Sequence, residues 1–94
     1  MRIRWTNCAA ADLESIVNFI RTDNPEAAHG VGRKLYSTAE SLSSMPSRGR
    51  VGLVEGTREL IVARLPYILV YQIVSGRVRI LRVYHGSRQW PKKF

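Results

Sequence analysis

The chain has 94 residues, of which 45% are hydrophobic, so the sequence predicts a single compact domain over residues 1–94 and excludes two separate cores. Fifteen Lys and Arg residues against seven Asp and Glu residues give a formal net charge of +8, which favours a polyanionic partner. The apolar runs are far too short to cross a bilayer and no signal peptide is visible, so no membrane partner is expected and the cytoplasm is the expected compartment.

The N-terminal half predicts one strand and two helices. Residues 2–5 alternate polar and apolar side chains, which is typical of a short strand. A helix is expected to start from a cap at Thr6 or Asn7 and to end near Thr22, because apolar residues recur on one helical face. Asn24-Pro25-Glu26 combines a cap residue, a proline at the first helical position and an acid in the first turn. It predicts a second helix that runs to about Ser44.

The C-terminal half predicts three strands. Residues 46–56 are expected to form a loop, and the apolar period then changes to two. This pattern predicts strands over residues 57–65, 67–74 and 77–85, followed by a short tail or a helical turn over 86–94. We therefore expect an α+β fold of order β-α-α-β-β-β, in which the two N-terminal helices pack on one face of a small twisted antiparallel sheet. The other face is then free to be basic and partly exposed.

The net charge is confined to the C-terminal half. Residues 1–47 hold five cationic and five acidic side chains, whereas residues 48–94 hold ten cationic side chains against only Glu55 and Glu59. Gathered on one open surface, this charge would suit a nucleic acid or an acidic protein segment. A basic surface without a dedicated ligand is an equally good interpretation of the charge alone.

The last predicted strand carries the candidate acid or base. Its two alternating faces are Arg77, Arg79, Leu81, Val83 and His85 on one side, and Val78, Ile80, Arg82 and Tyr84 on the other. Because each face mixes apolar and cationic side chains, the strand alone does not identify its buried face. His85 ends the strand near Arg82 and Arg88, where an imidazole could serve as acid or base toward an RNA 2′-hydroxyl or leaving oxygen. The alternative, which spacing alone favours, is a structural histidine hydrogen-bonded at a strand end.

Further arginines are candidate phosphate ligands. Arg58 and Arg64 are expected to share one face of their strand, where they could grip a phosphate or stabilise a pentavalent phosphorane. The alternative is that both are solvated or paired with nearby glutamates. Arg48 and Arg50 lie in the predicted loop and could clamp a phosphate backbone, although a solvated loop is the commoner meaning of such a stretch.

The tail interleaves basic and aromatic side chains. Arg88, Trp90 and Lys92 could bind phosphates and stack on bases. An equally good alternative is that the Trp-Pro pair packs the terminus against the core.

No metal or cofactor is expected. The chain has only two histidines, His29 and His85, and one cysteine, Cys8, so no zinc-binding spacing exists. No phosphate-cradling glycine loop of the usual nucleotide-binding kinds is present either.

Several segments taken together resemble one family. They are Asp23-Asn24-Pro25, Gly56-Thr57-Arg58-Glu59-Leu60, Pro66-Tyr67 with Val70-Tyr71, and Ile80-Leu81-Arg82-Val83-Tyr84-His85. In this order and spacing, over nearly the whole chain, they resemble RelE/ParE superfamily toxins of type II toxin–antitoxin systems. The resemblance implies a compact toxin that an acidic antitoxin binds and silences in a hetero-oligomeric complex.

The resemblance implies one of two targets. RelE-like members enter the ribosome and cut mRNA without a metal through attack by the 2′-hydroxyl, whereas ParE-like members poison DNA gyrase. His85 matches a histidine that some ribosome-dependent relatives use as acid or base. Ile68, however, stands where nuclease members often carry an arginine, and Arg58, Arg64, Arg82 or Arg88 would have to replace it.

The charge pattern favours mRNA cleavage slightly over gyrase inhibition. In this hypothesis His85, Arg82 and Arg58 carry the chemistry, and the loop and tail cations hold the substrate. An inactive toxin homologue or a plain RNA-binding module is a third possibility. Partner binding is expected from the basic face and the apolar flanks of the helices, which would attract an acidic antitoxin that folds on contact.

Overall fold

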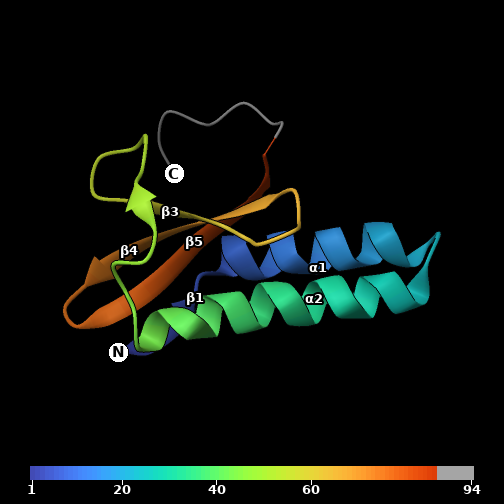
Figure 1. Cartoon of the computed structure of the whole chain (residues 1–94), viewed down its shortest axis with the longest axis horizontal. Helices are drawn as coiled ribbons and strands as arrows, with labels where there is room; N and C mark the ends of the chain where they lie inside the picture. The colour runs from blue at the N-terminus through green and yellow to red at the C-terminus, as the bar shows by residue number, and fades with distance from the viewer. Residues whose placement is uncertain (87–94) are drawn as a thin grey trace.

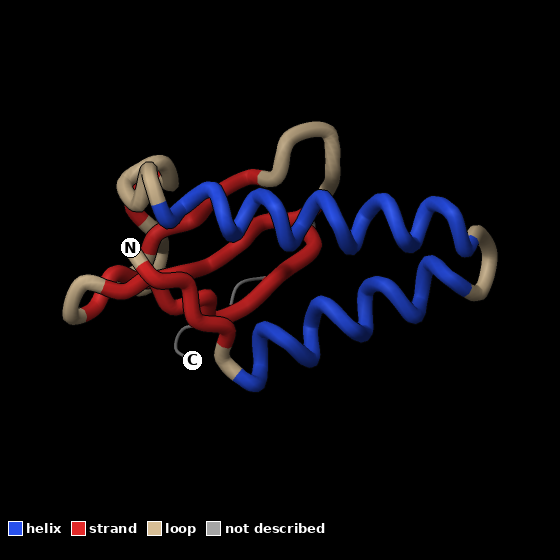
Figure 2. Tube along the Cα trace, turned by 90° about the horizontal axis from the view of Figure 1, so that it is seen from below, coloured by secondary structure: helices blue, strands red, loops and turns tan. Residues whose placement is uncertain are grey.

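The computed structural model describes residues 1–86, which form two helices packed on one face of a five-stranded sheet (Figures 1 and 2). The elements in chain order are β1 (Arg2–Trp5), α1 (Asn7–Arg21), α2 (Pro25–Glu40), the 3₁₀ turn η1 (Ser41–Ser43), β2 (Arg50–Val51), β3 (Arg58–Ile61), β4 (Tyr67–Val74) and β5 (Arg77–His85). The expected α+β class is confirmed. No helix within the described part of the chain is long and apolar enough to cross a membrane.

The sheet is mixed rather than antiparallel. Its strand order is β1-β5-β4-β3-β2, and β1 runs parallel to β5 while the other neighbours are antiparallel. Parallel neighbours need a long crossover, which the helix pair and the three following strands provide. The two-residue strand β2 lies within the expected loop 46–56 and pairs with β3 at the opposite edge. The prediction of a purely antiparallel sheet was therefore wrong at β1.

Local capping chemistry sets both helix starts. The Thr6 hydroxyl accepts a hydrogen bond from the Ala9 amide at 3.1 Å, and the Asn24 side-chain oxygen accepts one from the Ala27 amide at 3.0 Å. Each bond satisfies an amide that has no partner within its helix. Pro25 occupies the first turn of α2, where its missing N–H costs nothing. The predicted helix starts are confirmed.

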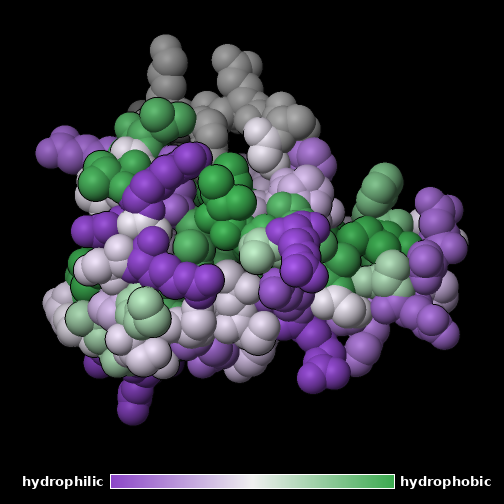
Figure 3. Space-filling view, in the orientation of Figure 1, coloured by the Kyte–Doolittle hydropathy of each residue, from purple (hydrophilic) through white to green (hydrophobic). Residues whose placement is uncertain are grey.

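The helix pair extends beyond the sheet. The end of α1 and the start of α2 project past the strands in both ribbon views (Figures 1 and 2). Apolar side chains gather on the surface over this part of the helices (Figure 3). Phe19 of α1 is 77% exposed, an unusual state for so large an apolar side chain. This end of the molecule therefore presents apolar surface that no strand covers.

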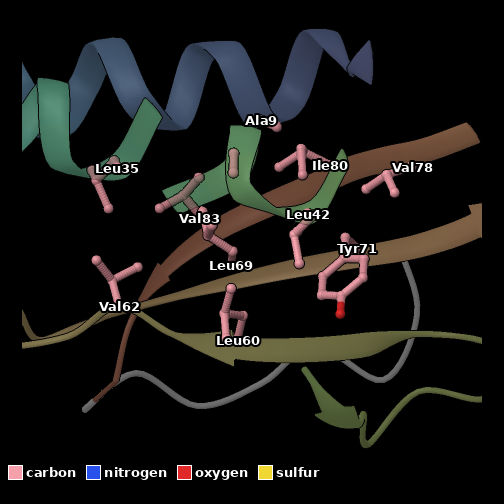
Figure 4. Packing of buried hydrophobic residues seen from close by; sticks show 11 residues of the cluster. Ala9, Leu35, Leu42, Leu60, Val62, Leu69, Tyr71, Val78, Ile80 and Val83 are labelled. Carbon is pink, nitrogen blue, oxygen red and sulfur yellow. The ribbon is translucent and has the colours of Figure 1, made fainter. Parts of the chain in front are cut away.

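The core lies between the helices and the sheet (Figure 4). Side chains from both layers point toward each other, and its largest fully buried members are Tyr71, Leu35, Leu42, Leu69 and Ile80. The sheet thus has a helix face, which the two helices cover, and an opposite face that neither helix covers, which we call the open face.

A β-bulge in β5 resets which side chains are buried. Tyr71 pairs with Ile80 and Val70 pairs with Arg82, so Leu81 is an extra residue in the ladder. Val78 and Ile80 lie on the helix face before the bulge, and Val83 lies on it afterwards. Neither of the two faces expected from strict alternation is therefore the buried one. The bulge explains why each of them mixed apolar and cationic residues.

Strand β3 is shorter than predicted. It ends at Ile61 instead of continuing to residue 65, because the chain turns between Val62 and Leu65, whose amide donates to the Val62 carbonyl at 3.1 Å. Arg64 sits in this turn with φ of 66°, the left-handed region that non-glycine residues rarely adopt. The expectation that Arg64 shares a strand face with Arg58 was therefore wrong.

Candidate functional site

A hollow lies between α1 and the ends of β4 and β5. Its lining includes Asp12, Ile16 and Phe19 from α1 together with Tyr67, Val83 and His85 from the strands. His85 is half-buried, and its ring meets the Tyr67 ring edge-on, with the ring centres 5.6 Å apart. The hollow therefore joins an apolar wall to one imidazole and one carboxylate.

The Asp12 carboxylate is bound to β5. Arg82 donates from Nε to Oδ2 at 2.7 Å and from Nη2 to Oδ1 at 2.9 Å, and the Val83 amide donates to Oδ2 at 2.9 Å. Strand β1 ends at Trp5, which pairs with Ile80, so the carboxylate covers the edge of β5 where the parallel partner stops. Asp12 thus links the first helix to the last strand.

The Arg82 guanidinium is occupied by partners within the chain. Its hydrogen bond and charge interaction with Asp12 raise its pKa further above the ordinary arginine value. Its other flank lies over the Tyr84 ring, with Cζ 4.9 Å from the ring centre. Burial raises the pKa of Tyr84 as well, because it disfavours the phenolate. A guanidinium held on two sides is a poor candidate for gripping a phosphate at the same time.

The candidate phosphate-binding arginines of β2, β3 and the preceding loop also form hydrogen bonds within the protein. Arg58 donates to the carbonyls of Gly49 at 2.8 Å and Ser47 at 3.4 Å, so it fastens that loop to the sheet. Arg50 donates twice to Glu59, at 3.2 and 3.0 Å, and Arg48 donates to the Ser41 hydroxyl at 2.8 Å. Glu59, one of the two glutamates near Arg58 in the sequence, is thus bound by Arg50.

The structure does not bring together His85, Arg82 and Arg58, the three candidate catalytic residues. His85 lies opposite Tyr67 on β4, whereas Arg58 lies opposite Tyr71, four residues and roughly 13 Å further along that strand. Arg82 follows the bulge and lies on the open face beside Tyr84. The positions of Arg88, Trp90 and Lys92 lie outside the described residues.

One nominated arginine lies in a segment next to the end of β5. Arg64 belongs to the turn before β4, and the Gly86 amide donates to the Pro66 carbonyl at 2.7 Å. Ile68, which stands where nuclease relatives often carry an arginine, pairs with Tyr84 and is only 8% exposed. Its buried side chain adds no charge at this position.

Two arginines of the first strand were not among the candidate residues predicted from the sequence. Arg2 and Arg4 of β1 pair with Arg77 and Arg79 of β5, so four guanidinium groups share the open face. The available signal was an arginine at every second position in both segments. Pairing between the first and last strands could not be read from that signal. Within residues 1–86 no group of three or more His, Cys, Asp or Glu side chains is placed to hold a metal ion.

Comparison with known proteins gives a consistent result. Residues 3–90 match the family model described as the ParE toxin of the type II toxin–antitoxin system, parDE. The putative toxin Y4kP of Sinorhizobium fredii is 42% identical over 97% of this chain and 94% of its own length. Toxin RelE2 of Caulobacter vibrioides is 37% identical, over 93% of this chain and 97% of its own.

Two solved structures share the fold. The chromosomal ParDE toxin–antitoxin system from P. aeruginosa superposes with a TM-score of 0.85 at 27% identity, over 90% of this chain and 95% of that one. The RelBE2 toxin–antitoxin complex from Mycobacterium tuberculosis gives a TM-score of 0.61 at 29% identity, over 89% and 95% of the two chains.

Proposed function

Because the chain belongs to the ParE toxin family of type II toxin–antitoxin systems, we propose that it stops bacterial growth by binding DNA gyrase rather than by cutting mRNA. Cleavage of RNA without a metal requires an acid or base and a cationic group at the same phosphate. The separation of His85, Arg58 and Arg82, with both guanidiniums held by internal partners, carries the proposal. The closer superposition on the ParDE toxin also supports it.

Ribosome-dependent mRNA cleavage is the second candidate, and the position of His85 favours it. The imidazole borders an open hollow beside Tyr67, where a substrate could reach it. In this proposal Arg64, Arg88, Trp90 and Lys92 supply phosphate and base contacts, and the ribosome completes the site. An inactive homologue or a plain RNA-binding module would show neither activity.

Replacing His85 separates the two proposals. We expect the wild-type chain to block supercoiling by purified gyrase and to trap cleaved DNA–gyrase complexes. We expect His85→Ala to keep this activity within a few-fold, because a protein-binding surface loses little when one half-buried ring is trimmed. His29→Ala, an exposed histidine on α2, is the matched control.

Toeprinting of mRNA on ribosomes gives the opposing readout. New cleavage sites that disappear in His85→Ala and persist in His29→Ala would contradict the gyrase proposal and establish the nuclease. A wild-type chain without effect in either assay, and without effect on growth when expressed alone, would indicate the inactive homologue.

We also infer that the antitoxin covers the apolar flank of α1. An acidic partner that folds on contact would bury its apolar face in the hollow beside Phe19 and Ile16. Its negative charge would complement the net positive charge of the toxin. Burial of an exposed Phe side chain stabilises a complex by about 1.5–3 kcal/mol.

Phe19→Ala is therefore expected to weaken binding of the cognate antitoxin by about ten- to a hundred-fold, as measured by calorimetry. Leu53→Ala provides the control, because Leu53 is also largely exposed, at 74%, but lies in the loop between β2 and β3. Equal affinities for wild type and Phe19→Ala would place the antitoxin elsewhere.

A further inference from the structure

Four arginines form a compact array on the open face of the sheet. The parallel ladder pairs Arg2 with Arg77 and Arg4 with Arg79, and paired residues project to the same side of a sheet. The intervening residues Ile3 and Val78 pack toward the core, so all four guanidiniums point away from the helices. All four side chains are exposed. We call this set, Arg2, Arg4, Arg77 and Arg79, the arginine array.

Among the described residues, no carboxylate forms an ion pair with the array. All seven acidic side chains of the protein lie within residues 1–86, and the ion pairs formed there join Asp12 to Arg82 and Glu59 to Arg50. Only Glu55 lines the same shallow hollow as Arg79, and it forms no ion pair with that residue. Like charges placed directly opposite each other across a ladder destabilise a sheet. Two such pairs side by side therefore cost stability unless an anion neutralises them.

We propose that the arginine array binds the phosphate backbone of duplex DNA. Adjacent strands are about 4.8 Å apart and alternate residues about 7 Å apart, so the array offers two rows of forked donors to neighbouring phosphates. Gln72 pairs with Arg79 on the adjacent strand and adds an uncharged donor on the same face. The guanidinium of arginine binds phosphate with more defined geometry than the ammonium of lysine, because it donates two parallel hydrogen bonds.

The surroundings of the array favour a duplex over single-stranded RNA. Proteins that bind single strands present aromatic rings on which bases stack. Among the described residues near the array, Trp5 instead packs against the core and stacks on Tyr36, and the Tyr84 ring is covered by Arg82. Contact is thus limited to the backbone, which positions a duplex without reading its sequence. The hollow at His85 opens on the helix side, so this inference does not depend on the toxin's target.

The test measures how salt weakens binding of the purified chain to a short fluorescent DNA duplex. Each phosphate contact contributes about 0.9 to the slope of log affinity against log salt, so the array predicts a slope near −3.6. Arg77→Ala/Arg79→Ala should weaken binding at least about ten-fold at low salt and reduce the slope by about 2. Arg2→Ala/Arg4→Ala should do the same from the other strand.

The control removes the same charge elsewhere. Arg33→Ala/Lys34→Ala truncates two exposed cations on α2 and should leave the slope unchanged within about 0.5. If this control lost as much DNA affinity and slope as the array variants, the effect would come from net charge alone, and the proposal would be overturned. Tighter binding of single-stranded RNA than of duplex, or displacement of DNA by polyglutamate at equal charge concentration, would assign the array to another partner and overturn it as well.

Discussion

Asp12→Ala is expected to lower the free energy of unfolding by about 2–3 kcal/mol in urea denaturation. The change removes the partner of two guanidinium donors and of the Val83 amide at once. Breaking one side of a buried ion pair costs about 3–5 kcal/mol, and the 33% exposure of the Arg82 side chain places this pair below that range. The loss also detaches α1 from the free edge of β5, so amide exchange at Val83 should accelerate.

Glu14→Ala is the matched control for this prediction. It removes the same charge from an exposed position on the same helix, and it is expected to change stability by less than about 0.5 kcal/mol. In a double-mutant cycle, Asp12→Ala and Arg82→Ala should couple by at least about 1 kcal/mol. If Glu14→Ala destabilised the fold as much as Asp12→Ala, net charge rather than the bound carboxylate would hold the helix to the strand.

Those parts of the fold that depend on neighbouring residues could be predicted from the sequence. Asn24 and Pro25 identify a helix start because the cap and the proline act within a single turn. Strands β4 and β5 have the expected bounds, Tyr67–Val74 and Arg77–His85, since alternation and the turn between them are also local signals.

Features that depend on distant partners could not be predicted. The parallel pairing of β1 with β5 joins residues about as far apart as the described chain allows, and no local pattern specifies it. The extra residue at Leu81 shifts the buried face of β5 without any glycine or proline to mark it. Strand β2 exists because Arg50 and Val51 pair with β3, and two residues are too few to show a period.

The same limit applies to the candidate site. The cationic half of the chain is evident from the sequence, but which of its cations have internal partners is not. Arg82 is neutralised by an acid 70 positions earlier, and Arg58 is used to hold a loop. Conversely, Arg2 and Arg4 belong to the half without net charge and still form a cluster of four exposed arginines with Arg77 and Arg79. Total charge therefore did not show which arginines are available to a ligand, whereas pairing in the sheet gives each arginine a distinct role.

Tyr71→Phe is expected to cost about 1–3 kcal/mol of unfolding free energy, although it removes only one oxygen atom. The Tyr71 hydroxyl accepts a hydrogen bond from the Gly49 amide at 2.8 Å and donates one to the Pro46 carbonyl at 2.7 Å. The ring is fully buried, so the phenylalanine would leave the amide and the carbonyl without a partner. Gly49 lies so close that a Cβ atom there would come within 2.7 Å of the hydroxyl oxygen.

Tyr36→Phe tests whether the effect belongs to this contact. Tyr36 is 53% exposed, and removal of its hydroxyl is expected to change stability by less than about 0.5 kcal/mol. Amide exchange at Gly49 should accelerate in Tyr71→Phe alone. The Arg58 contacts to Ser47 and Gly49 should weaken with it, because the same loop is held from both sides. Unchanged exchange at Gly49 in Tyr71→Phe would mean that Arg58 is sufficient to hold the loop, and that this buried hydroxyl contributes only to packing.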